Sequence, residues 1–137
     1  MNCVPNWLKW TYTALVVTLA PIYAAHYGPA NFLWFSNIAL IVALVGIWIR
    51  SRLLIGMMAV AVLIPEMGWN LDFWFQMLTG RELFGFVAYM FDPSYPLWLR
   101  ALSLFHVPLP FMLLWLVRRC GYDRRALRWQ SVAAWVV

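Results

Sequence analysis

Long apolar runs alternate with short polar turns along this chain. The runs cover residues 7–27, 30–49, 53–78 and 97–117, and most charged residues fall in the turns between them. A helix of about 20 residues spans the roughly 30 Å hydrocarbon core of a bilayer. The pattern therefore predicts an all-α integral membrane bundle with four transmembrane helices, formed by residues 1–137 as a single domain.

Two further segments are apolar but too short to cross a membrane. Residues 81–91 are expected to form an interfacial helix between the third and fourth spans. From Leu127 onward eleven residues remain, which gives about 16 Å of helix at 1.5 Å per residue. We expect this segment to be the start of a fifth helix, in a domain that is truncated at its C-terminus; the alternative is an interfacial tail.

Helix-breaking residues in and just after the third run predict a kink and an end for its helix. Pro65 removes a helical hydrogen bond near the middle of this run, so we expect a kink there. Thr79 and Gly80 close the run, since glycine is the usual residue just past a helix C-terminus.

Composition excludes a soluble domain. Hydrophobic residues make up 65% of the chain and charged residues 11%, whereas soluble domains carry about 25% charged residues. Ten tryptophans suit helices that cross two lipid–water interfaces. The net charge of +5 comes from short basic clusters in the turns, which is a topology signal and does not form a nucleic-acid-binding face.

The basic residues are distributed unevenly over the two ends of the predicted bundle. Only Arg81 and Arg100 fall at one end, and the other end carries Lys9, Arg50, Arg52, Arg118, Arg119, Arg124, Arg125 and Arg128. The positive-inside rule therefore predicts a cytoplasmic N-terminus. Cys3 and Cys120 belong to the same end, and their wide separation in the sequence predicts two free thiols.

Polar groups inside the predicted spans define a candidate site. Glu66 is an intramembrane carboxylate, and Asn70 and Asp72 share a broad helical face with it at about 100° per residue. Such groups usually face the interior of a bundle and are functional candidates. Further polar residues fall in the same outer half of the membrane on the second and fourth spans: Asn31, Ser36, Asn37, Arg100, Ser103 and His106.

This distribution predicts a polar cavity that opens to the outside. Glu66 and His106 are expected at its floor, at similar depth and facing each other, with Asp72 and Arg100 near its entrance. The predicted ligand-binding residues are Glu66, His106, Asn70, Asp72, Asn37 and Arg100. A structural interpretation stays open beside this one, in which Asn37 and Asn70 form interhelical hydrogen bonds and Asp72 pairs with Arg100.

Specific catalytic chemistry has less support. A haem needs two histidines at one depth, and His26 and His106 differ in depth. No ligand-spacing motif indicates a metal, and Ser103 with His106 lacks a recognisable nucleophile elbow. The sequence therefore leaves the cofactor unknown.

Two segments carry a resemblance. Residues 26–40, HYGPANFLWFSNIAL, and residues 69–73, WNLDF, resemble an uncharacterised group of bacterial multi-pass inner-membrane proteins. The resemblance implies a bacterial inner membrane, and it brings no reaction or substrate with it.

Three functions fit these expectations. The first is binding or transport-like handling of a small polar or amphiphilic molecule in the outward-facing cavity. The second is an intramembrane enzyme acting on a lipid or isoprenoid. The third is a structural subunit whose polar face meets another membrane protein. The expected partners are accordingly the bilayer, a lipid or small-molecule ligand, and a membrane-protein partner.

Overall fold

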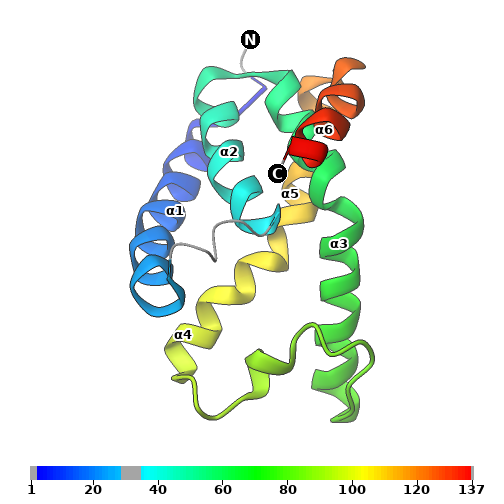
Figure 1. Ribbon diagram of the computed structural model, residues 1–137. Coiled ribbons are helices and arrows are strands. Elements are labelled where there is room, and N and C mark those ends of the chain that lie inside the picture. The colour runs from blue at the N-terminus through cyan, green and yellow to red at the C-terminus, as the bar shows by residue number, and fades with distance from the viewer. Residues whose placement is uncertain (1–2, 29–34, 137) are drawn as a thin grey trace.

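The computed structural model describes residues 3–28 and 35–136, and it is helical with no strand among them (Figure 1). Asn31 falls outside this range, as do the side chains at positions 35 and 36. The elements are α1 (Asn6–Tyr27), α2 (Phe35–Ile49), α3 (Arg52–Thr79), the 3-10 turn η2 (Ala88–Phe91), α4 (Leu97–Leu102), the 3-10 turn η3 (Ser103–His106), α5 (Pro108–Cys120) and α6 (Arg125–Val136).

Two helical segments are long and apolar enough to span a membrane, and the prediction of four is wrong by this measure. Within the described residues they are Arg52–Thr79, which is α3, and Leu97–Cys120, which joins α4, η3 and α5. The apolar helix Asn37–Ile49 is shorter, and α1 contains Lys9, Pro21 and several hydroxyl side chains that dilute its apolar character. Length and composition thus give weak support for a membrane protein.

The ends of α3 confirm the predicted third helix. Ser51 precedes the helix, and its side chain accepts a hydrogen bond from the Leu54 N–H at 3.2 Å. At the other end Gly80 has a left-handed backbone with φ 73°, and its N–H donates to the Gln76 carbonyl at 2.8 Å. Caps of this kind satisfy backbone groups that the helix itself leaves unpaired.

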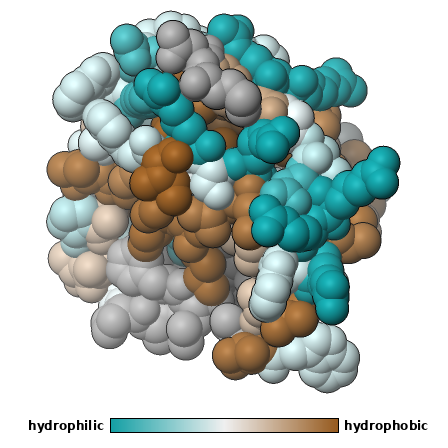
Figure 2. All heavy atoms as spheres, turned by 90° about the horizontal axis from the view of Figure 1, so that it is seen from above, coloured by the Kyte–Doolittle hydropathy of each residue, from teal (hydrophilic) through white to brown (hydrophobic). Residues whose placement is uncertain are grey.

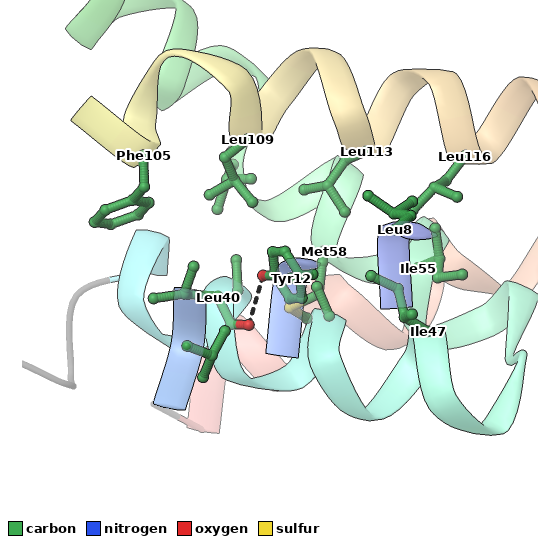
Figure 3. Packing of buried hydrophobic residues seen from close by; sticks show 14 of the residues in the cluster. Leu8, Tyr12, Leu40, Ile47, Ile55, Met58, Phe105, Leu109, Leu113 and Leu116 are labelled. Carbon is green, nitrogen blue, oxygen red and sulfur yellow. Dashed lines mark hydrogen bonds between the residues drawn. The ribbon is translucent and has the colours of Figure 1, made fainter. Parts of the chain in front are cut away.

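The main core lies where the first two helices meet α5. Leu109, Leu113 and Leu116 project from α5 toward α1 and α2 (Figure 3), and each is almost fully buried. The Tyr12 hydroxyl of α1 donates to the Leu40 carbonyl of α2 at 2.6 Å, so the phenol is satisfied within an apolar setting.

Residues 81–91 do not form the predicted interfacial helix. Only η2 is helical there, and Gly85 has φ 84°, a conformation that ends regular helix. The exposed side chains of Phe84 and Phe86 stack at 5.4 Å, while Val87 is fully buried. The segment is therefore a loop that packs against the bundle through buried Val87 and Met90.

The expected start of a fifth helix is the helix α6, which packs along α3. Gly56 is the point of close approach, because a Cβ atom built there would lie 3.0 Å from the Cβ of Ala126. Ala126 is fully buried as a result.

A disulfide joins Cys3 to Cys120, and the prediction of free thiols is wrong. Their Cα atoms lie 5.1 Å apart although 117 positions separate them in sequence. Cys3 precedes α1 and Cys120 ends α5, and both helix ends lie at the same end of the bundle (Figure 1).

That end of the molecule is also the basic one. Figure 2 looks onto it and shows hydrophilic side chains spread over much of the surface. The arginines exposed around the α2–α3 and α5–α6 connections are Arg50, Arg52, Arg118, Arg119, Arg124, Arg125 and Arg128. Lys9 differs from them, since it is buried with its amine 5.7 Å from the Trp48 ring centre.

Candidate functional site

Glu66 and His106 form a buried pair, which confirms that they face each other. Nδ1 of His106 lies 2.8 Å from Oε2 and 3.0 Å from Oε1 of Glu66. Glu66 is 2% exposed and His106 is 8% exposed. A carboxylate on Nδ1 fixes the ring orientation and favours the tautomer with a proton on that nitrogen.

Two aromatic rings stack on the imidazole of His106. Trp69 stacks on it with ring centres 4.6 Å apart, and Phe105 stacks on it at 4.1 Å. Trp69 lies three positions after Glu66 on α3, so both side chains reach the same part of η3. This i, i+3 spacing was the signal that could have placed Trp69 in the candidate site, where the sequence reasoning missed it.

Asn70 ties α3 to η3 through backbone carbonyls. Its Nδ2 donates to the Glu66 carbonyl at 2.8 Å and to the His106 carbonyl at 2.9 Å. Pro110 has no N–H to offer the His106 carbonyl four residues earlier, so Asn70 supplies the missing donor. The predicted interhelical hydrogen bond of Asn70 is therefore confirmed. Its Oδ1 is buried and has no hydrogen-bond partner among the described residues.

Hydroxyl groups extend the polar cluster toward α1 and η2. Ser103 Oγ and the Tyr23 hydroxyl lie 2.8 Å apart, and Trp69 Nε1 donates to the Tyr89 hydroxyl at 3.3 Å. Burial raises the pKa of the Tyr89 phenol, hydrogen bonds with Ser103 and Trp69 act against that rise, and the negative charge of Glu66 adds to it. Neither tyrosine has a sequence spacing that relates it to Glu66, and both were missed.

Asp72 and Arg100 are engaged with the 81–96 connection and not with each other. Asp72 is fully buried; its Oδ1 accepts the N–H groups of Leu83 and Phe84 at 3.3 and 3.1 Å, and its Oδ2 accepts that of Val87 at 3.2 Å.

Arg100 bonds backbone carbonyls in the same connection. Its Nε donates to Tyr95 and its Nη1 to Met90, both at 3.1 Å. Within the described residues the proposed Asp72–Arg100 salt bridge is absent, because the ion pairs there are Glu66–His106 and Asp123–Arg125.

The largest cavity of the two described is an apolar cleft between α1 and α5, which we call the α1–α5 cleft. Its volume is about 540 Å³. It is lined by Trp7, Leu8, Thr11, Tyr12, Leu15, Leu40, Phe105, Pro108, Leu109, Phe111, Met112 and Trp115. A smaller cavity of about 180 Å³ lies between α2, α3 and α6 and is lined mainly by apolar residues.

Neither cavity is the polar, outward-facing one that the sequence predicted. Glu66, His106 and Asn70 line neither of them; they are packed into the core and bonded to one another. Asn37, the remaining predicted site residue, is buried on α2. Phe105 is the contact between the two regions, since it lines the α1–α5 cleft and stacks on His106.

The fold and site define an all-helical protein with a buried acid–base pair beside an apolar cleft. No protein family, no curated protein and no solved structure matches the chain. In the described part of the chain, no group of three or more His, Cys, Asp or Glu side chains is placed to hold a metal ion.

Proposed function

We propose that this chain is a multi-pass membrane protein that binds an amphiphilic molecule, with the hydrocarbon part of that molecule in the α1–α5 cleft. The observation that carries the proposal is the cleft itself. Its volume of about 540 Å³ falls within the range of roughly 300–1,000 Å³ for ligand sites, which are mostly apolar.

The end of the cleft near the basic surface suits a polar headgroup. Trp7 and Trp115 face each other there, with ring centres 6.5 Å apart. The guanidinium of Arg119 lies 5.2 Å from the Trp115 ring centre. This positive charge is one helical turn beyond Trp115, which lines the cleft. Indole rings and arginine at one level are typical of a lipid–water interface, and this arrangement favours an anionic headgroup.

The proposal includes the membrane in which the protein lies and its orientation there. The concentration of arginines at one end supports a cytoplasmic N-terminus, and the bacterial inner membrane is the bilayer we infer for it. An amphiphile already dissolved in that bilayer reaches the α1–α5 cleft laterally, so binding does not require an aqueous polar cavity. Transport-like handling would then move such a molecule between the cleft and the surrounding lipid.

Photo-crosslinking tests this proposal. The protein is placed in bilayer discs that contain phosphatidylglycerol with a diazirine in its acyl chain, and the crosslinked peptides are identified by mass spectrometry. We expect crosslinks at cleft residues such as Leu15 and Met112 that persist when unlabelled phosphatidylcholine is in excess. Crosslinks that fall only on outward-facing residues such as Ile64, which is 83% exposed, would contradict the proposal.

Two tryptophan substitutions provide the matched comparison. Met112→Trp fills the cleft and should abolish the cleft crosslinks. Ile64→Trp adds the same bulk on the exposed face of α3 and should leave them unchanged. Circular dichroism and the unfolding temperature of both variants show that a lost crosslink reflects a filled cleft and not an unfolded protein.

A further inference from the structure

Within the described residues Glu66 and His106 form an ion pair with each other and with no third charged side chain. Apart from this pair, the ion pair within the described residues is Asp123–Arg125, in which the arginine is largely exposed. A buried net charge is costly in a low-dielectric interior. The pair therefore favours the state that holds two protons, distributed over Nδ1, Nε2 and the carboxylate. This state is either a carboxylate with an imidazolium or a carboxylic acid with a neutral imidazole, and it has no net charge.

The second of these protons belongs to Nε2. Nδ1 is turned to the carboxylate, and no described residue is hydrogen-bonded to Nε2. The imidazole side chain is 11% exposed, against 3% for the Glu66 side chain. Nε2 is thus the position at which a proton can be exchanged while the Glu66–Nδ1 contact stays intact.

The groups that face the pair from the neighbouring elements are two phenols, a hydroxyl and an amide. They are Tyr89 from η2, Tyr23 from α1 by way of Ser103, and Asn70 from α3. Phenols ordinarily ionise near pH 10, and amides and hydroxyls do not ionise in the working range. Asp72 lies further along α3 and is committed to the 83–87 backbone.

Phe105 connects the pair to the α1–α5 cleft. Its ring is part of the cleft lining and stacks 4.1 Å from the imidazole centre. It occupies the opposite end of the cleft from Trp7 and Trp115, where the hydrocarbon tail of a bound amphiphile would end. Because His106 itself does not line the cleft, a tail could act on the pair only through Phe105: packing this ring more tightly on the imidazole would limit the access of water and favour the state of the pair without net charge.

We propose that Glu66 and His106 form a proton-binding site, with exchange at Nε2, and that filling the cleft makes the pair hold its proton more tightly. The coupling to the cleft rests on the proposed function, whereas the proton site does not. Because binding linkage is reciprocal, protonation of the pair equally tightens binding of the amphiphile.

Histidine NMR tests the proton site directly. The chain has two histidines, so His26→Gln leaves His106 as the single reporter in protein labelled with ¹⁵N-histidine. We expect a pH-dependent change at Nε2 with Nδ1 protonated throughout. Glu66→Gln should remove the Nδ1 preference and move the transition, and Thr18→Ala, at an exposed site on α1, should change neither. A spectrum that stays constant with pH, or that is identical in Glu66→Gln, overturns the proton site.

The coupling is tested by repeating this titration with and without phosphatidylglycerol in the discs, phosphatidylcholine being the background lipid. We expect phosphatidylglycerol to raise the proton affinity about fivefold or more, and Met112→Trp to abolish that change. Cleft crosslinks without a change in the titration would overturn the coupling and leave the proposed function standing. Absent crosslinks would overturn the proposed function and the coupling, while the NMR result on the proton site stands separately.

Discussion

Asn70 shows how one side chain can replace a backbone donor that the chain lacks. Its Nδ2 reaches the His106 carbonyl, whose helical partner position is Pro110. Asn70→Ala removes that donor and leaves a buried carbonyl unpaired, so we expect a loss of about 1–3 kcal/mol in unfolding free energy. Unfolding by sodium dodecyl sulfate, followed by circular dichroism, measures this.

Thr18→Ala is the control for Asn70→Ala. It deletes an exposed hydroxyl that bonds the Ala14 carbonyl of its own helix, and we expect almost no change. Equal stability of the two variants would show that the Asn70 bridge contributes nothing.

Asp72 fixes the 81–91 loop by accepting three backbone N–H groups. Asp72→Ala should therefore speed hydrogen exchange at Leu83, Phe84 and Val87, by about tenfold for each 1.4 kcal/mol of lost hydrogen bonding. Asp92→Ala is the control, because the Asp92 carboxylate accepts the nearby Ser94 N–H at 2.9 Å and not an N–H of residues 83–87. Unchanged exchange in Asp72→Ala would contradict the anchoring role.

The contact between Glu66 and His106 could be predicted because the rise per residue of a helix gives the depth of each residue in the membrane. Glu66 was counted back from the C-terminal end of its helix and His106 forward from the N-terminal end of its own, and the two depths agree. It did not predict Tyr23 or Tyr89 in the cluster, since their positions depend on how α1 and η2 pack. Asp72 was assigned to the cavity entrance because its actual partners are backbone N–H groups of a loop. Every residue type except proline has such a group, so the sequence does not reveal them.

Among the elements, the contact of α3 with α6 depends on one glycine. Gly56→Ala brings two Cβ atoms to 3.0 Å, which requires the neighbour to give by a few tenths of an ångström. Because Ala126 is fully buried, we expect a cost of about 1–3 kcal/mol. We expect faster tryptic cleavage at the arginines that begin α6. Gly68→Ala is the matched substitution on the same helix, where the nearest atom lies 3.9 Å away, and it should be neutral or stabilising. Similar cleavage of both variants would contradict the close packing.

The helices α1 and α3 could be predicted to within a residue or two because their ends coincide with turn-forming residues. The interfacial helix could not, because the 81–91 loop takes its shape from Asp72, a partner outside the segment. The fourth span was predicted as one helix, and Pro108 and Pro110 divide it at η3. The Leu104 carbonyl, four residues before Pro108, accepts the Val107 N–H at 3.0 Å, and the His106 carbonyl, four residues before Pro110, accepts Asn70 of the candidate site.

For the molecule as a whole, the disulfide and the basic surface lie at the same end. If that end is cytoplasmic, as the charge distribution predicts, the thiols are reduced in the cell and pair on purification in air. We expect alkylation after acid quenching of intact cells to label both cysteines, and alkylation of the purified protein to label neither until a reductant is added. A bridge already present in cells would place this end in an oxidising compartment and reverse the proposed orientation.

In the oxidised protein the bond between Cys3 and Cys120 makes a covalent ring that contains α1 to α5 and leaves α6 as a tail. A single cut inside the ring yields two pieces that stay joined until they are reduced, whereas a cut after Cys120 leaves α6 with no covalent link to the ring. The disulfide also attaches the start of α1 to the end of α5, close to Trp7 and Trp115. At the far end of the cleft the Tyr23 ring lies 6.2 Å from the Phe105 ring and the Tyr23 hydroxyl bonds Ser103, so in the oxidised protein α1 is held to the η3–α5 segment at both ends of the cleft.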